Sequence, residues 1–269
     1  MINIVLLLLS VLLIILLTVK WKVHPFLALL AAALFFALFS GMALDTIVNQ
    51  VNDGFGRTLG NIGIVIVLGV IIGAFLEHSG GAYKLADVVL RIIGKKRVHE
   101  AMGIVGFIVS IPVFADSGFI ILNPLNKSLT KAAGLSIVGT STALFLGLLI
   151  THVLVPPTPG PIAAAGIIGA DVGLVMMVGL VIGMLSLIIA IVYCKKIASR
   201  IYIDPNPEIT DELIAEKMKQ APSAFKSFLP ILIPILLIVG KSIMEFSLTE
   251  GLEPSGLVKF FSFIGSPII

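Results

Sequence analysis

Seven long apolar runs constrain this chain more than any other feature of its sequence. Each approaches the roughly 20 residues that an α-helix needs to cross the hydrocarbon layer of a bilayer. The runs cover residues 2–19, 26–43, 58–76, 102–122, 135–155, 174–193 and 225–240, and an eighth starts near Leu257. Only helices and closed barrels satisfy their backbone in lipid, and these runs lack the alternating polarity of barrel strands. We therefore predict an all-α, multi-pass protein of an inner membrane.

The composition excludes several classes of function. Only 12% of the 269 residues are charged and 58% are hydrophobic, against about 25% charged residues in an ordinary soluble domain. The basic residues lie at segment edges rather than in one aromatic-laced patch, so nucleic acid is not an expected partner. The sequence has no zinc-protease motif, no Walker A loop and no G-x-S-x-G elbow. We therefore expect no enzyme, no metal site and no cofactor.

The distribution of positive charge predicts a topology that simple spans cannot produce. Lys and Arg residues gather in the loops 77–101 and 194–224, and both loops should therefore be cytoplasmic. Lys20 and Lys22 follow the first run, which places the N-terminus outside. Three plain spans between the two loops would put them on opposite sides of the membrane. One of the three intervening units must therefore differ from a plain span.

Two of those units carry residues that interrupt a helix. The segment PVFADSGFIILNPL at residues 112–125 places prolines and polar residues inside an apolar run, and we predict a re-entrant hairpin with its tip near Ser117 and Gly118. The segment HVLVPPTPGPIAAAGIIGADVG at residues 152–173 has four prolines within six residues. No continuous helix accommodates that density of proline. We predict a broken helix whose second half starts at Ile162.

These features divide the chain into three predicted parts. Residues 1–101 hold the first spans and a basic loop, residues 102–173 the hairpin and the broken helix of a transport core, and residues 174–269 the following spans. The eighth run is too short to cross a bilayer. We expect it to begin a truncated second half.

The predicted breaks are the first place to look for ligand-binding residues. Helix breaks in a bilayer are costly unless they line a cavity or bind a ligand, and the N-termini of half-helices attract anions. An apolar setting disfavours the charged form of Asp116, which suits a proton carrier. The alternative is a carboxylate that caps a helix or faces a water-filled vestibule. Ser117 and Gly118 would offer a hydroxyl and backbone N–H groups to an anion.

Further candidates lie in the next helix and in its break. Three consecutive hydroxyl residues could bind a hydroxylated carboxylate or, alternatively, bond back to their own helix. They are Thr140, Ser141 and Thr142. His152 is a candidate proton relay or ligand donor, or else an interfacial residue. Thr158 and Gly160 lie inside the proline-rich break, where a backbone freed from helical bonding can bind a ligand.

Other polar residues are weaker candidates. Asp171 could be a second ionisable site, although a helix-end position is the favoured alternative. We expect interfacial positions for a further group of four: Glu77, His78, His99 and Glu100. Glycine pairs at GxxxG spacing, which permits close helix contact, occur at 56/60, 69/73 and 179/183. Such pairs arise readily by chance in a chain with 26 glycines.

The segments 112–125 and 152–173 together resemble the signatures of the gluconate permease (GntP) family, and the resemblance extends over essentially all of the chain. It implies a proton symporter for gluconate or a related hydroxy or amino acid. It also implies a fold similar to the ion-transporter superfamily, with two inverted repeats and a dimeric assembly. The implied substrate-facing positions are Asp116, Ser117, Thr140 to Thr142, and His152 with residues 156–161.

We accordingly expect proton-driven import of a small, gluconate-like hydroxycarboxylate. Sodium coupling stays open, because unwound carbonyl groups also coordinate Na⁺. The alternative of a different class is a non-transporting scaffold or a split subunit that needs a second chain.

Overall fold

The chain is helical throughout the part that the structure describes. The structure, a computed structural model, describes all residues except 1, 95–96, 206–218, 247–255 and 267–269. Within these limits, four helices are long and apolar enough to cross a membrane, or five if the two parts of α3 count as one span. The prediction of an all-α, multi-pass architecture is thus confirmed. The chain separates into two compact units, residues 1–61 and 62–269.

The first unit contains two helices that are apolar around their whole circumference, as expected for helices in lipid. α1 (Ile2–Ile15) continues as the π-helical turn Leu16–Lys20, and α2 (Pro25–Phe39) packs against it. Pro25 occupies the first position of α2, where its missing N–H leaves no hydrogen bond unmade. The first part of α3 (Leu44–His78) completes the unit. α2 ends four residues before the predicted limit of its run.

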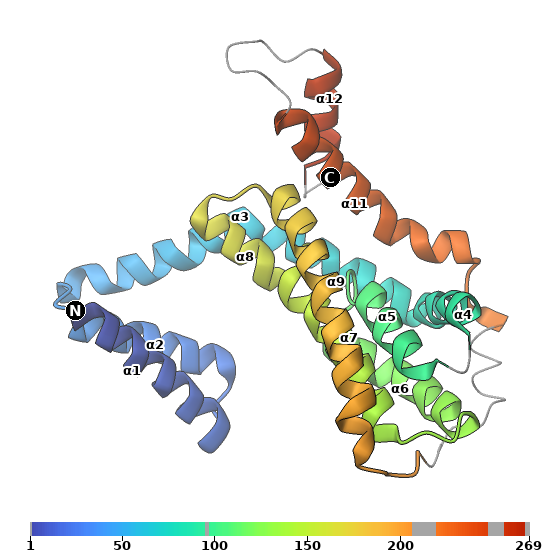
Figure 1. The fold of residues 1–269 in the computed structure, drawn as a ribbon. Helices are drawn as coiled ribbons and strands as arrows, with labels where there is room; N and C mark the ends of the chain where they lie inside the picture. The colour runs from blue at the N-terminus through green and yellow to red at the C-terminus, as the bar shows by residue number, and fades with distance from the viewer. Residues whose placement is uncertain (1, 95–96, 206–218, 247–255, 267–269) are drawn as a thin grey trace. The chain divides into compact units, whose positions relative to one another are not determined.

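The second unit is built around three neighbouring helices (Figure 1). α5 (Val98–Val109), α7 (Ile137–Leu154) and α9 (Val172–Lys196) pack along one another, and α6 (Ala115–Ala132) packs on α5 and α7. The remaining helices of this unit are the second part of α3, α4 (Gly81–Ile93), α8 (Pro159–Ile168), α11 (Ala224–Phe246) and α12 (Gly256–Ile264). The main apolar core lies among α4, α5, α6 and α7.

Glycines bring the backbones of α5 and α7 into direct contact. A Cβ atom at Gly106 would lie 2.5 Å from the carbonyl oxygen of Leu144, and one at Gly147 would collide with the carbonyl oxygen of Gly103. Helices in lipid gain no hydrophobic free energy from association, so close van der Waals packing through small residues becomes important. This crossing therefore fixes the position of both helices that lead into the predicted breaks.

The glycine pair at GxxxG spacing in α9 is used for packing. A Cβ atom at Gly179 would collide with the carbonyl oxygen of Leu154, and one at Gly183 would lie 2.9 Å from the ring of Phe107. α9 is thereby packed against α7 and α5. A Cβ atom at Gly56 or Gly60, in contrast, would meet no atom within 4 Å.

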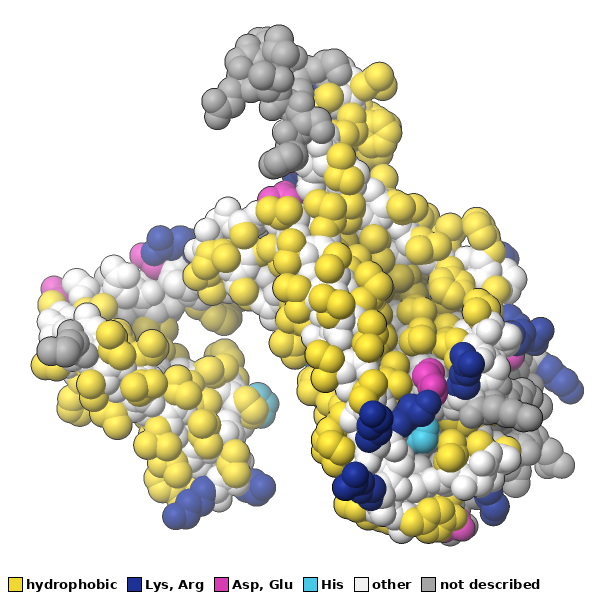
Figure 2. Space-filling model, viewed as in Figure 1, with side chains coloured by type: hydrophobic (Ala, Val, Ile, Leu, Met, Phe, Trp, Pro, Cys, Tyr) yellow, Lys and Arg dark blue, Asp and Glu magenta, His cyan; other side chains and the backbone are white. Residues whose placement is uncertain are grey.

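Polar side chains connect the start of α5 to the end of α9. His99 Nε2 lies 2.8 Å from Ser199 Oγ, and Ser199 Oγ donates to the carbonyl oxygen of Cys194 at 2.9 Å. Lys195 Nζ pairs with Glu100 Oε1 at 2.7 Å. Figure 2 shows basic side chains gathered at one end of the otherwise apolar second unit.

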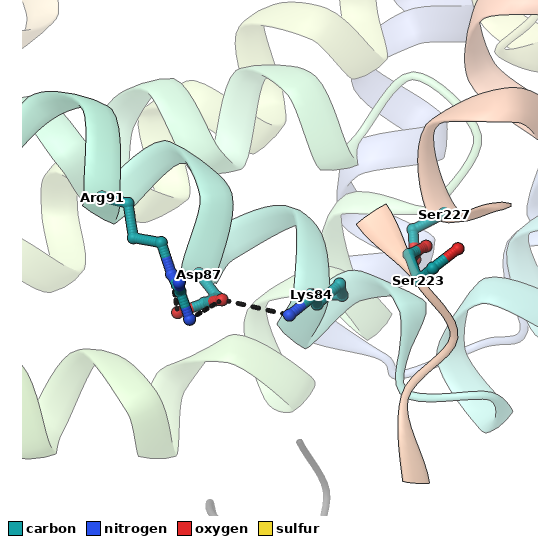
Figure 3. A network of polar contacts seen from close by, with 5 residues as sticks. All are labelled: Lys84, Asp87, Arg91, Ser223 and Ser227. Atoms are coloured by element: carbon teal, nitrogen blue, oxygen red, sulfur yellow. Dashed lines mark hydrogen bonds and ion pairs between the residues drawn. The ribbon is translucent and has the colours of Figure 1, made fainter. Parts of the chain in front are cut away.

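The predicted loop 77–101 contains the amphipathic helix α4. Its apolar residues recur at helical spacing and are buried, among them Ala82, Leu85, Ala86, Val89 and Leu90. Its outer face carries Asp87 between two basic residues, Lys84 at 3.3 Å and Arg91 at 3.1 Å (Figure 3). Some of the basic residues that led us to predict a loop therefore lie on one face of a helix.

Candidate functional site

The first helix break lies between α5 and α6, at residues 110–114. Ser110 is fully buried, and its hydroxyl donates to the carbonyl oxygen of Val113 at 3.2 Å. Pro112 lacks the N–H of a helical residue and disfavours helical geometry at Ile111. The turn therefore precedes the predicted tip by several residues, because Ser117 and Gly118 already lie in the first turn of α6.

α6 continues through Asn123 and Pro124, two residues that were expected to interrupt it. Pro124 removes one backbone donor, so a carbonyl in the preceding turn loses its helical partner. Asn123 and Asn126, on either side of the proline, both hydrogen-bond to Ser141 of α7. We attribute the continuity of α6 across Pro124 to these tertiary bonds.

The second break lies between α7 and α8, at residues 155–158, as the proline-rich segment predicted. α8 starts at Pro159 rather than at Ile162. The earlier start has a simple physical reason, because the first turn of a helix needs no intrahelical N–H donors. Pro159 and Pro161 both fall in that turn and leave no bond unmade.

The two breaks meet on the face of α3 that carries Gly69 and Gly73. A Cβ atom at Gly73 would lie 2.5 Å from the carbonyl oxygen of Pro112, and one at Gly69 would lie 3.9 Å from that of Pro157. Residues of both breaks and of α3 line one small cavity of about 10 Å³, which is about the smallest cavity that can hold one water. The lining residues include Gly69, Pro112, Phe114, Pro157 and Thr158. Segments more than 40 residues apart thus share one site.

The N-terminus of α6 offers the richest set of free backbone donors at this site. The amides of Ala115, Asp116 and Ser117 have no intrahelical acceptor, and no side chain caps the helix. The Gly118 amide donates to the carbonyl oxygen of Phe114 at 2.8 Å and is therefore occupied. A Cβ atom at Gly118 would also lie 2.7 Å from the side chain of Leu148, so this glycine serves packing.

The N-terminus of α8 is a poorer donor group. Pro159 and Pro161 have no N–H, which leaves the amide of the exposed Gly160 as the free donor of the first turn. Thr158 is buried, and its hydroxyl donates to the carbonyl oxygen of Val155 at 2.7 Å. Thr158 thereby stabilises the break itself.

Two ionisable residues lie beside the breaks. Asp116 has an exposed side chain in the first turn of α6, where the helix dipole favours negative charge. His152 is half-buried in the last turn of α7, and its ring contacts that of Phe114 edge-to-face with centroids 5.6 Å apart. His152 Nδ1 is buried and has no hydrogen-bond partner among the described residues. The hairpin and the broken helix, predicted separately, thus contact each other through Phe114 and His152.

The three consecutive hydroxyl residues of α7 have different roles. Thr142 Oγ1 donates back to the carbonyl oxygen of Val138 at 2.6 Å, as the alternative reading expected. Ser141 instead bonds to side chains of α6, and Thr140 bonds both to a side chain of α6 and, at 3.4 Å, to the carbonyl oxygen of Ile137 in its own helix. Their partners are Thr130, Asn126 and Asn123. Sequence reasoning missed these partners, although polar residues at helical spacing within a membrane-embedded unit were a signal that could have found them.

Asp171 takes the favoured alternative, a helix-end position. It is the N-cap of α9 and accepts a hydrogen bond from the amide of Leu174 at 2.7 Å. The hydroxyl of Ser242 on α11 donates to the same carboxylate oxygen. Asp171 thus caps α9 and joins it to α11.

A larger cavity of about 210 Å³ adjoins the breaks and is lined almost entirely by apolar side chains of α3 and α11. Polar contacts to a ligand must therefore come from the helix ends rather than from this cavity. Among the residues that the structure describes, no group of three His, Cys, Asp or Glu side chains could hold a metal ion.

Paired helix breaks within a helical membrane unit are a feature of many secondary-transporter folds. Comparison of the sequence with known proteins agrees with that class. The model of the family described as "GntP family permease" matches residues 2–269. The chain belongs to this family of permeases, which is not a family of enzymes, and it is a multi-pass membrane protein of the inner-membrane type. No solved structure matches the chain.

Several curated relatives are similar over nearly the whole chain. The gluconate permease of Pseudomonas aeruginosa is 36% identical over 94% of this chain and 56% of its own length. The D-serine transporter DsdX of Escherichia coli K12 is 36% identical over 97% of this chain and 58% of its own. The high-affinity gluconate transporter of the same organism is 29% identical over 97% of this chain and 58% of its own length. The chain therefore spans little more than half the length of these relatives.

Proposed function

We propose that this protein imports a small hydroxycarboxylate, such as gluconate, together with protons. The observation that carries the proposal is the meeting of two helix breaks, each followed by a helix N-terminus, on the glycine face of α3. Relatives named for gluconate and for D-serine support a small substrate that carries a carboxylate. The family resemblance further supports a re-entrant arrangement of α5 and α6 and a homodimer.

The carboxylate of the substrate binds, in this proposal, at the N-terminus of α6. Three free amides and the positive end of the helix dipole suit an anion there. The amide of Gly160 adds a fourth donor from α8. The Ser117 hydroxyl, half-buried in the same turn of α6, is a further donor to the bound acid.

Asp116 couples the proton to the anion by electrostatic repulsion. Its carboxylate and that of the substrate compete for the same positive helix end. Two unit charges about 6 Å apart repel by about 3 kcal/mol at an effective dielectric constant of about 20, which corresponds to roughly a hundredfold in affinity. Protonation of Asp116 removes this repulsion. Proton and anion therefore bind cooperatively, and each raises the affinity for the other by the same factor.

His152 passes the proton between Asp116 and water in this scheme. Its ring contacts Phe114, two residues before Asp116, and its Nδ1 is free to accept a proton.

Transport by the purified protein tests the proposal. Radiolabelled gluconate uptake into proteoliposomes is measured with an inward proton gradient, with an inward sodium gradient and with neither. We expect accumulation above the external concentration with the proton gradient alone. Accumulation with sodium alone would contradict proton coupling. Binding without uptake under every condition would instead favour a subunit that works only with a second chain.

A further inference from the structure

A chain of buried hydrogen bonds between α6 and α7 ends at one side chain with a free donor. Thr140 and Thr130 share a bond of 2.7 Å, and Thr130 Oγ1 donates to Asn126 Oδ1 at 3.3 Å. Asn126 Nδ2 then donates to Ser141 Oγ at 2.9 Å, and Ser141 Oγ donates to Asn123 Oδ1 at 3.4 Å. From Thr130 onward each member donates to the next, so this part of the chain has one direction.

The cost of burying these groups indicates more than ordinary packing. Asn126, Thr130 and Thr140 are completely buried in a unit built from membrane-spanning helices. Polar groups cost free energy there unless every one is paired, and apolar side chains could join the two helices without that cost. A directional chain of hydrogen bonds polarises its members and holds them in one orientation. The orientation is imposed most directly on Asn123, the last acceptor.

Asn123 has a donor group that the protein does not use. Its Oδ1 accepts from Ser141, which directs Nδ2 away from that bond. Asn123 is half-buried, and its side chain bonds to Ser141 through Oδ1 and not through Nδ2. A partly accessible amide whose orientation is fixed by a buried network is suited to donate to a ligand.

The helical register places Asn123 on the same side of α6 as the proposed anion position. Asn123 follows Asp116 by seven residues, which is about two turns and about 10 Å along the axis. Ile120 lies between them and is 73% exposed, so this stripe of α6 is accessible. A ligand bound by its carboxylate at the start of α6 and extended along this stripe would bring its far end toward Asn123.

We propose that Asn123 recognises the distal hydroxyl groups of a long hydroxycarboxylate. Its Nδ2 donates to a hydroxyl oxygen near the end of the acid that is remote from the carboxylate. Asn126 and the three hydroxyl side chains are positioning residues that act through Asn123. This inference rests on the proposed carboxylate position at α6.

Selectivity between a long and a short acid separates recognition from a structural role. Gluconate can reach from the start of α6 toward Asn123, whereas glycolate, a two-carbon hydroxy acid, cannot. A merely structural asparagine would affect both acids equally, because loosening α6 from α7 displaces the shared carboxylate position. Loss of a hydroxyl contact affects gluconate alone.

The test is equilibrium binding of radiolabelled gluconate and glycolate to the purified full chain. We expect Asn123→Ala to weaken gluconate binding about tenfold, the effect of losing one well-placed hydrogen bond, and to change glycolate binding less than twofold. Asn49→Ala, at an exposed asparagine of the first unit, is the matched control and should change neither affinity. Asn123→Leu, which preserves side-chain volume, replaces the alanine variant if that variant does not fold.

Equal loss of both acids, or loss of neither, in the Asn123 variants would overturn the inference. Its failure is distinguishable from failure of the proposed function. If the wild-type protein binds neither acid, the carboxylate position is wrong and this inference falls with it. If the wild type binds both acids and the variants keep its selectivity, the inference alone is wrong.

Discussion

Asp116→Asn should abolish proton-driven accumulation of gluconate while leaving its binding intact. The amide has the shape of a protonated carboxylic acid and carries no charge, so the repulsion between Asp116 and the bound anion is permanently absent. Without a titrating group at the helix end, the anion no longer requires a proton to bind. Gluconate should therefore equilibrate across the membrane and cease to accumulate, a loss of tenfold or more in the concentration ratio across proteoliposomes.

The same variant should change how affinity depends on pH. In the wild type, gluconate binding should weaken by up to about a hundredfold as rising pH ionises Asp116, because the two negative charges then repel each other. In the Asn variant the affinity should stay constant over that range. Asp87→Asn is the matched control, because Asp87 is paired with Lys84 and Arg91 on α4. Fully concentrative uptake by the Asp116 variant would rule out this residue as the coupling group.

Gly106→Ala should strongly destabilise the second unit, although it adds only one methyl group. The new Cβ would lie 2.5 Å from the carbonyl oxygen of Leu144 and 2.9 Å from the amide of Leu148. Both neighbours are backbone atoms of α7, so neither can rotate aside. Overpacking of this kind costs about 3 kcal/mol, which lowers the thermal midpoint by roughly 10 °C in a chain of this size.

The measurement is the loss of monodisperse protein in detergent on heating. Gly240→Ala, also within a helix, is the control, because its Cβ would meet no atom within 4 Å and alanine favours helix. That substitution should leave the midpoint unchanged or raise it slightly. Equal midpoints for the two variants would show that α5 and α7 do not pack by backbone contact at Gly106.

The sequence predicted the existence of the two helix breaks more accurately than the residues at which they begin and end. Dense prolines after Val155 made a break there unavoidable, because a helix interior cannot supply the missing donors. Pro112 and Pro124 are each single prolines in α-rich surroundings, yet only Pro112 lies in a break. The difference depends on the bonds from Asn123 and Asn126 to Ser141, which are tertiary contacts and leave no mark on local sequence.

Local sequence also could not predict that the two helix breaks lie next to each other. The spacing of Gly69 and Gly73 equals that of Gly56 and Gly60, but only the former pair faces the carbonyl groups of the two breaks. Asp116, Ser117 and His152 were chosen as candidates because charge and hydroxyl groups are conspicuous between apolar residues. The contact of Phe114 with His152 joins two segments that sequence reasoning treated separately. That pairing is a property of the fold.

The different roles of the polar residues depend on how deeply each is buried. Thr140 was expected to face a ligand, but it is fully buried and bonded to Thr130. Asn123 is half-buried within α6, and its side chain bonds to Ser141 through Oδ1, which leaves Nδ2 as a donor. Hydroxyl and amide residues that look alike in sequence are thus distinguished by the partners that they already have.

The most direct test of the account is to count the protons taken up when gluconate binds to the purified protein. The measurement uses a weakly buffered solution at a pH where Asp116 is ionised in the free protein, and it records the pH change on adding gluconate. The account predicts proton uptake that approaches one per bound gluconate in the wild type and is absent in Asp116→Asn. Binding of gluconate to the wild type without proton uptake would contradict coupling at the start of α6.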